Sequence, residues 1–359
     1  MPARAFSHLS RRSLILAALA AAAPESWALP ERTLQFPRDF GSHPDLQTEW
    51  WYITGHAKSA AGREFGFQVT FFRSRVDAAQ GLRSAFAAKH LVFAHAAVTD
   101  LEGRVLLHEQ RIARAGFGIA SASEADTDVR LRDWSLLRNK DGSYSARVPA
   151  GEFSFDLRFT PTQPVLLQGK AGLSRKGPEE AQASYYYSEP QLRTQGKLTL
   201  KKGQAFDVDG TAWLDHEWSE ALMHPDAVGW DWIGMNLDDG SALTAFRLRR
   251  RDGSALWSGG SFRTRDGALR SFGSDEVRFD GAKAWTSPRT QAKYPTQWRV
   301  ETPSGIFEVR ALLDDQELDS RGSTGGVYWE GVSDLLDAQG RRIGRGYLEM
   351  TGYAAPLRL

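Results

Sequence analysis

Hydrophobic and polar residues alternate through much of this chain, and this period of two constrains its fold more than any other feature. Phenylalanine or valine occupies every second position from 65 to 71, and residues 154–159, 197–201 and 306–310 repeat the alternation. Successive side chains of a β-strand point to opposite faces of a sheet, so the pattern predicts half-buried strands. Turn signals separate such stretches: Ala61-Gly62, Glu102-Gly103, Asp141-Gly142, Asp209-Gly210, Asp239-Gly240, Asp252-Gly253, Asp266-Gly267 and Gln339-Gly340. We therefore predict an all-β chain of antiparallel hairpins that form barrels or sandwiches.

A weak internal repeat divides the sequence into two halves. Residues 51–53, a turn at Gly62 and a second strand form one unit, and residues 231–233, a turn at Gly240 and a second strand form a similar unit half a chain later. Such self-similarity predicts two related β domains. We place the N-terminal domain at residues 35–222 and the C-terminal domain at residues 223–359.

The first 28 residues have the layout of an export signal. A basic stretch that includes Arg11 and Arg12 precedes the apolar residues 14–23, and residues 26–28 offer a small-x-small cleavage site. The sequence around the two arginines is similar to a twin-arginine signal. The apolar run is too short for a membrane span of about 20 residues. We expect residues 1–28 to be removed on export, which predicts a periplasmic or secreted protein.

Composition excludes several classes of function. The chain has no cysteine, so it has no thiol nucleophile, disulfide or cysteine-ligated metal. Its 45 Lys and Arg nearly balance 44 Asp and Glu, which gives no electrostatic footprint for nucleic acid. No second apolar run approaches the length of a membrane span. With 12 Trp, 9 Tyr and 19 Phe, many rings must lie inside, where they either line a pocket for an apolar ligand or fill a solid core.

The densest polar cluster lies at residues 213–220, where Asp215 and Glu217 flank His216. On an extended strand His216 and Trp218 share one face, and Asp215 and Glu217 share the other. We expect the first pair to face the interior and the two carboxylates to pair near the domain junction. His216, Asp215 and Glu217 are the predicted catalytic residues, and Trp218 is a predicted ligand contact. A purely structural corner remains an alternative, as does a metal site that adds His224, although we predict no metal.

Three further aromatic clusters supply predicted ligand contacts. Glu49 and Trp51 would share one face of a strand, where Glu49 could either act as an acid with a raised pKa or pair with an arginine. Tyr186 lies in a run of three tyrosines whose hydroxyls could hold a polar end of a ligand. Trp232 lies in a Trp-Asp-Trp sequence. Each cluster could equally be structural.

Several of these motifs resemble the AttH-like family, which is related to carotenoid 1,2-hydratases. The resemblance spans residues 43–353 in one order: His43-Pro44, EWWYITG at 49–55, FAHAAVTD at 93–100, YYYS at 185–188, DHEW at 215–218 and GYLEMTGY at 346–353. It implies two lipocalin-like β-barrel domains. In carotenoid hydratases a histidine and a tryptophan two residues apart belong to the site, and the resemblance implies that His216 and Trp218 correspond to them. A tyrosine and an aspartate of the hydratases have no counterpart in residues 243–248.

The resemblance implies chemistry without a cofactor. Carotenoid hydratases protonate an isolated double bond, and water then traps the carbocation. That reaction needs a proton donor, aromatic faces and a dry cavity. Fungal relatives include a hydratase and cyclases, and bacterial members accompany ABC-transporter components and carry the label of secreted hydrolases. Three hypotheses follow: a hydratase acting on an isoprenoid or lipid, a non-catalytic periplasmic lipid carrier or chaperone associated with an ABC transporter, and a hydrolase using Ser184, Ser188 or Ser219 beside His216.

Overall fold

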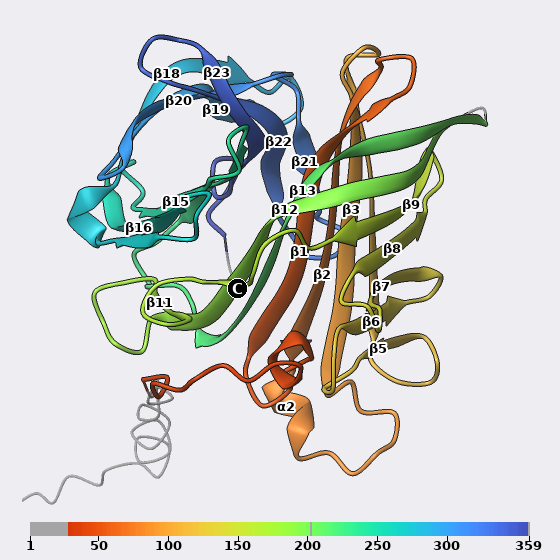
Figure 1. Cartoon of the computed structure of the whole chain (residues 1–359). Coiled ribbons are helices and arrows are strands. Elements are labelled where there is room, and N and C mark those ends of the chain that lie inside the picture. Colours follow the sequence, from red (N-terminus) through yellow and green to blue (C-terminus); the bar gives the residue numbers. More distant parts are fainter. Residues whose placement is uncertain (1–27, 202, 358–359) are drawn as a thin grey trace, which may run out of the picture.

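The computed structural model describes residues 28–201 and 203–357, and it consists almost entirely of two curled antiparallel sheets (Figure 1). The predicted all-β fold class is confirmed. The first sheet runs from red to green in Figure 1, and the second from teal to blue. The predicted export signal lies outside the described residues except for Ala28. No helix among the described residues is long and apolar enough to cross a membrane.

The first sheet curls until its ends approach each other, because β3 and β4 at one end contact β5 and β6 at the other. Its strand order is β4-β3-β2-β1-β13-β12-β9-β8-β7-β6-β5, with the short strands β10 and β11 beside β12. The strands are β1 (Thr48–Ser59), β2 (Glu64–Arg75), β3 (His90–Asp100), β4 (Val105–Arg114), β5 (Ala120–Ala122), β6 (Asp128–Leu131), β7 (Trp134–Arg138), β8 (Tyr144–Pro149), β9 (Phe153–Thr160), β10 (Leu166–Leu167), β11 (Leu173–Arg175), β12 (Ala183–Leu200) and β13 (Gln204–Ala221).

The second sheet has the order β17-β16-β15-β14-β23-β22-β20-β19-β18, with β21 beside β22. The strands are β14 (Gly229–Leu237), β15 (Ala242–Arg249), β16 (Ala255–Arg263), β17 (Leu269–Phe272), β18 (Arg278–Thr286), β19 (Lys293–Thr302), β20 (Gly305–Ala311), β21 (Glu317–Asp319), β22 (Val327–Leu336) and β23 (Arg342–Met350). Within residues 28–201 and 203–357, helical structure is confined to η1 (Arg38–Phe40), α2 (Asp77–Gln80) and η2 (Ser274–Glu276).

The two units of the internal repeat are both hairpins, β1–β2 and β14–β15. Gly240 closes the second hairpin with a φ of +92°, a conformation that glycine adopts without steric cost. The predicted turn at Asp209-Gly210 is wrong, because Gly210 lies inside β13. A Cβ on Gly210 would come within 1.9 Å of the His56 carbonyl oxygen, so the glycine permits close approach of β1 rather than a turn.

Aromatic and aliphatic side chains fill the interior of the first sheet. Phe65, Phe67, Phe71, Trp134 and Phe159 are fully buried in one cluster. Two hollows of the described surface lie elsewhere: one of about 700 Å³ beside α2, and one of about 500 Å³ around residues 239–266. Neither touches His216, so the rings near His216 pack against one another instead of lining either hollow.

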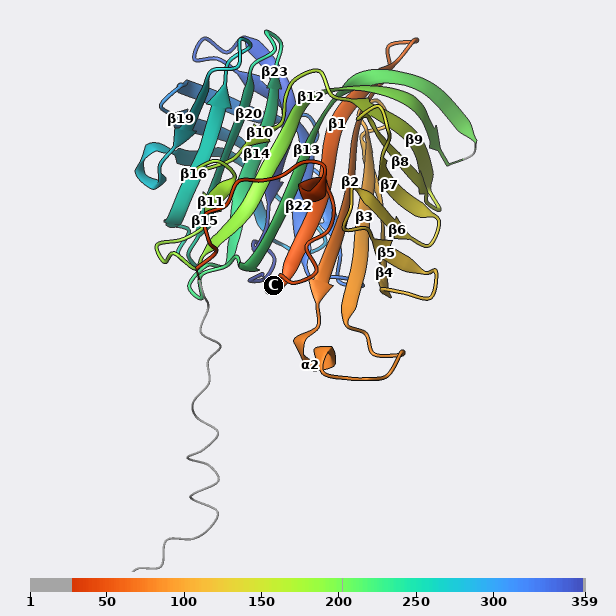
Figure 2. The same ribbon diagram turned by 60° about the horizontal axis from the view of Figure 1, so that its bottom comes forward.

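The N-terminal strap, which we define as residues 28–47, crosses β12, β13 and β1 before β1 begins (Figure 2). Leu34 and Phe40 of the strap are buried in the core of the first sheet. The Trp51 indole donates a hydrogen bond to the Phe40 carbonyl at 3.2 Å, and the Tyr185 hydroxyl donates to the Pro30 carbonyl at 2.5 Å. The strap therefore covers the inner-face residues of β1, β12 and β13.

A third apolar cluster joins the two sheets. It includes Tyr52 and Trp213 from the first sheet and Trp232, Val332 and Tyr347 from the second. β1 contacts β23, and β2 contacts β22. We call this region the junction.

Candidate functional site

β13 and β1 lie side by side, and their alternation sends the predicted site residues to two different places. His216 is paired in register with Trp51, and Trp218 with Glu49, and all four are buried in the interior of the first sheet. Asp215 is paired with Tyr52, and these two face the junction. The structure thus separates the predicted residues into an inner cluster and a junction cluster, with the β1–β13 pair between them.

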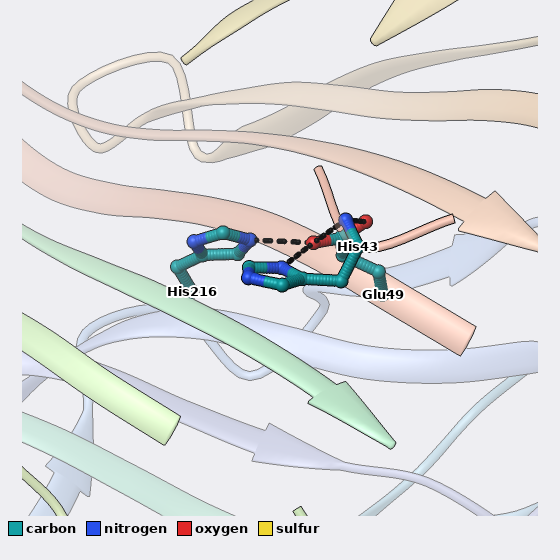
Figure 3. A group of neighbouring side chains, drawn as sticks. All are labelled: His43, Glu49 and His216. Carbon is teal, nitrogen blue, oxygen red and sulfur yellow. Dashed lines mark hydrogen bonds and ion pairs between the residues drawn. The ribbon is translucent and has the colours of Figure 1, made fainter. Parts of the chain in front are cut away.

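Glu49 is the centre of the inner cluster (Figure 3). Its Oε1 lies 2.7 Å from His43 Nδ1 and 3.0 Å from His216 Nε2. Its Oε2 accepts hydrogen bonds from Ser42 Oγ at 2.7 Å and Arg73 Nε at 2.9 Å. Burial alone would raise the pKa of Glu49, but the hydrogen bonds from His216 and His43 outweigh burial and hold that pKa well below its usual range. Pairing with an arginine is therefore the correct alternative for Glu49, and the expectation of a raised pKa is wrong.

His216 is neutral in this arrangement. Burial lowers its pKa to about 4, although the hydrogen bond to Glu49 acts in the opposite direction. Because Nε2 faces the Glu49 carboxylate, the single ring proton lies on Nε2, and Nδ1 accepts a hydrogen bond from the Tyr187 hydroxyl at 3.1 Å. Both ring nitrogens have partners, so His216 has no free proton to give to a ligand while the strap is in place.

His43, on the strap, touches two carboxylates at once. Its Nδ1 meets Glu49, and its Nε2 lies 3.0 Å from Asp39 Oδ1. Burial would raise the pKa of Asp39, but hydrogen bonds from His43 and the Gln35 backbone lower it overall. The His43 ring therefore links Asp39 on the strap to Glu49 on β1. It also stacks on Trp218, with centroids 3.9 Å apart and planes 3° apart.

The junction cluster holds the two predicted catalytic carboxylates. Asp215 accepts hydrogen bonds from Ser188 Oγ at 2.5 Å, Tyr186 Oη at 2.6 Å and Trp213 Nε1 at 2.6 Å. Burial raises the pKa of Asp215 to about 7 against the effect of these donors. Glu217 pairs with Lys176 at 2.9 Å and accepts from Ser184 Oγ at 2.5 Å.

Tyr186 and Trp232 connect this cluster to the second sheet. The Trp232 indole donates to the Tyr186 hydroxyl at 3.3 Å, and Trp232 meets Tyr52 edge to face at 5.4 Å. Tyr186 therefore belongs with Asp215, while its neighbour Tyr187 belongs with His216. Predicted ligand contacts thus lie in both clusters: Trp51, Trp218 and Glu49 inside, and Tyr186 and Trp232 at the junction.

Two alternative sites raised by the sequence, a metal site and a serine nucleophile beside His216, are not formed in the structure. The metal site built from His216, Glu217 and His224 fails because Glu217 lies on the opposite face of β13 and His224 lies near Glu179. The three serines considered as nucleophiles bond elsewhere: Ser184 to Glu217, Ser188 to Asp215, and Ser219 to the Ala183 carbonyl.

A different trio, His43, Glu49 and His216, has the composition of a metal site, with donor atoms within 4.8 Å of one another. The residues fit a metal poorly. The Arg73 guanidinium lies against Glu49, and His43 uses the Nδ1 proton that a metal ligand would have to lose. The trio is better described as a hydrogen-bonded cluster.

Sequence reasoning missed three members of the inner cluster: His43, Arg73 and Tyr187. Arg73 could have been found, because it follows positions 65, 67, 69 and 71 at the same period of two. Tyr187 could not be separated from Tyr186 without knowing which face of β12 turns inward. His43 reaches Glu49 only because the strap folds back over β1.

Comparisons with known proteins agree with this architecture. The model of the AttH-like family matches residues 27–353. A crystal structure of an AttH candidate from Nitrosomonas europaea is 47% identical, superposes with a TM-score of 0.85, and the match covers 91% of this chain and 99% of that chain. No curated protein matches the chain.

Two more distant structures show the same fold and no more than the fold. Kievitone hydratase from Nectria haematococca is 14% identical, with a TM-score of 0.68 over 91% of this chain and 98% of that chain. CghA with Sch210972 is 13% identical, with a TM-score of 0.53 over 85% of this chain and 88% of that chain.

Proposed function

This chain belongs to the AttH-like family, and from that premise we propose that it hydrates an apolar, unsaturated isoprenoid or lipid at the junction by acid–base chemistry without a cofactor. The observation that carries the proposal is a group of junction carboxyls whose pKa values are raised by burial, in which Asp215 and Glu349 each reach about 7 beside the rings of Trp213, Tyr186 and Trp232. A carboxyl that keeps its proton near neutrality can supply protons to an alkene, and aromatic faces stabilise the cation that forms.

The junction suits this reaction better than the inner cluster does. Both nitrogens of His216 are occupied, Trp51 stacks on its ring at 4.6 Å, and the strap covers the cluster. We assign the inner cluster the role of holding the strap on the first sheet. Direct contact between His216 and a ligand would require the strap to leave.

The test is ligand capture followed by turnover in labelled water. Native mass spectrometry of protein purified from its host should reveal a retained apolar ligand, and incubation in ¹⁸O-water should place one labelled oxygen in the product. We expect Trp232→Ala to weaken ligand retention about tenfold, because an aromatic wall worth about 1–2 kcal/mol is lost. The matched control is Trp285→Ala, on β18 away from the junction. Retention that is unchanged in Trp232→Ala would remove the junction from the proposal.

A carrier is the second candidate, and the sealed inner cluster favours it, because a closed strap can open to admit a ligand without chemistry. A ligand that is retained but recovered unhydrated would support a lipid carrier or chaperone over a hydratase. In that role an ABC transporter is the partner we would propose. The three serines considered bond to Glu217, Asp215 and the Ala183 carbonyl and not to His216, so hydrolysis has no comparable support.

Export to the periplasm or medium is also part of the proposal. We expect Arg11→Lys/Arg12→Lys to leave the uncleaved precursor in the cytoplasm of a bacterium that has the twin-arginine pathway, because the paired arginines are the recognised element. Fractionation and immunoblotting measure this outcome. Replacement of Arg4 by Lys is the control, and secretion of the double variant at the normal level would argue against this route.

A further inference from the structure

Two glutamates, Glu330 buried and Glu349 half-buried, lie next to each other on the junction face of the second sheet. Glu330 on β22 is the register partner of Glu349 on β23, and Glu349 is in turn the partner of Trp232 on β14. Register partners of an antiparallel pair lie on the same face with Cβ atoms about 5 Å apart. Trp232, Glu349 and Glu330 therefore form one row that faces the first sheet.

The facing row of the first sheet is polar and incompletely satisfied. Tyr52 on β1 and Gln68 on β2 are 6% and 2% exposed. Among the described residues, no hydrogen-bond partner lies at the Tyr52 hydroxyl, Gln68 Oε1 or Glu330 Oε1. Gln68 Nε2 donates to Glu330 Oε2 at 3.0 Å, which fixes the amide against the glutamate. Unpaired buried polar atoms are costly, so atoms from two sheets left free in one place indicate a ligand or water that completes them.

The charges around the pair favour proton retention. Burial and the charge of Glu349 raise the pKa of Glu330 well above its usual range, although the nearby Tyr52 hydroxyl and the Gln68 amide act in the opposite direction. Burial raises the pKa of Glu349 to about 7, a hydrogen bond from Trp230 opposes that shift, and the charges of Asp215 and Glu217 add to it. The other titratable groups at the pair are Tyr52, Tyr328 and Tyr347. Lys176 is already paired with Glu217.

Asp215 cannot itself reach a ligand in this arrangement, because Ser188, Tyr186 and Trp213 occupy its oxygens. Glu330 has a free oxygen, and Glu349 is half-buried rather than sealed. We propose that Glu330 and Glu349 are the proton-exchanging pair of the junction, and that Tyr52 and Gln68 orient the oxygen of an apolar, unsaturated ligand beside them. This inference rests on the proposed hydration and names its acid and base.

The step balances within the pair. The protonated carboxyl gives its proton to one alkene carbon, so its O–H bond breaks while the π electrons form the new C–H bond and leave a carbocation. Water then bonds to the cationic carbon, and its extra proton passes to the carboxylate of the pair. The sum is one water added to one double bond, and the pair again holds one proton.

The first test needs no ligand. The infrared difference spectrum between the native chain and Glu330→Gln at neutral pH should contain the band of the buried protonated Glu330 carboxyl, because the subtraction cancels the bands of Asp215 and Glu189. Glu349→Gln should keep the band but lower its titration midpoint by at least one pH unit, because the neighbouring charge is gone. Glu308→Gln, on the solvent-facing part of β20, is the matched control and should leave the band unchanged.

The second test uses turnover in ¹⁸O-water. We expect Glu330→Gln to reduce labelled product at least a hundredfold, and Tyr52→Phe to raise KM more than it lowers kcat. Absence of the band from this difference spectrum overturns the pair, whether or not the protein turns over a ligand. Full hydration by Glu330→Gln overturns it as well. Loss of the band in Glu330→Gln without labelled product from the native protein would keep the pair and reject the hydratase proposal.

Discussion

Replacing Glu49 with glutamine is expected to lower the free energy of unfolding by about 3–5 kcal/mol, because it removes one partner of a buried ionic network. The amide cannot carry the charge that Arg73 requires, and its NH₂ group would face the donors that now bind the carboxylate. The Arg73 guanidinium, 3% exposed, would remain as an uncompensated buried charge. Chemical denaturation monitored by tryptophan fluorescence measures the loss.

Glu102→Gln is the control for this change, because Glu102 is exposed in the β3–β4 turn. The strap should loosen together with the network, since His43 binds the strap to Glu49. Limited proteolysis should therefore cut residues 28–47 faster in Glu49→Gln than in Glu102→Gln. A variant as stable and as resistant as the native chain would show that the inner cluster contributes little to holding the strap.

Replacing Glu189 with glutamine is expected to stabilise the protein above neutral pH. Burial raises the pKa of Glu189 to about 7, against hydrogen bonding from Tyr144 and the charge of Arg138. A carboxyl whose folded pKa exceeds its unfolded value binds more protons when folded. The contribution of Glu189 to the free energy of unfolding is fully present below about pH 4.5 and is lost as the pH rises to about 7. The loss amounts to about 3 kcal/mol for a shift of this size, and the neutral glutamine avoids it.

The measurement is the unfolding free energy of both proteins from pH 4.5 to pH 8. The native chain should lose stability over this interval more steeply than Glu189→Gln, and the two curves should separate progressively until about pH 7. Asp215 and Glu349 contribute slopes of the same sign in both proteins, so the difference between the curves isolates Glu189. Glu152→Gln, a half-exposed surface partner of Lys201, should follow the native curve. Parallel curves for Glu189→Gln would mean that Glu189 is ionised in the folded state at neutral pH.

Much of the fold followed from local pattern. The alternation in residues 63–75 defined β2, and the turn at Gly240 joined two strands as expected. The failure at Gly210 is informative, because the same dipeptide that closes hairpins elsewhere lies in the middle of β13. A glycine can serve a turn or a close backbone approach, and only the neighbouring strand distinguishes the two.

For the candidate site, the sequence predicted which residues share a face of a strand, but not which residues of other strands they contact. Alternation along 212–218 correctly separated His216 and Trp218 from Asp215 and Glu217. It could not show that Tyr187 meets His216 while Tyr186 meets Asp215. Nor could it place Glu330 beside Glu349, because that contact depends on the register of β22 and β23.

The sequence by itself determined an all-β chain and, where the alternation is clear, as in β2 and in residues 212–218, which side chains share a face of a strand. These properties are local, since the period of side chains along a strand is set by backbone geometry alone. Tertiary structure decided that His43 returns to Glu49, that Arg73 is buried with it, and that two rows of polar side chains meet at the junction. Those contacts join residues far apart in the chain, so they depend on which strands pair and in which register, and neighbouring residues do not encode that choice.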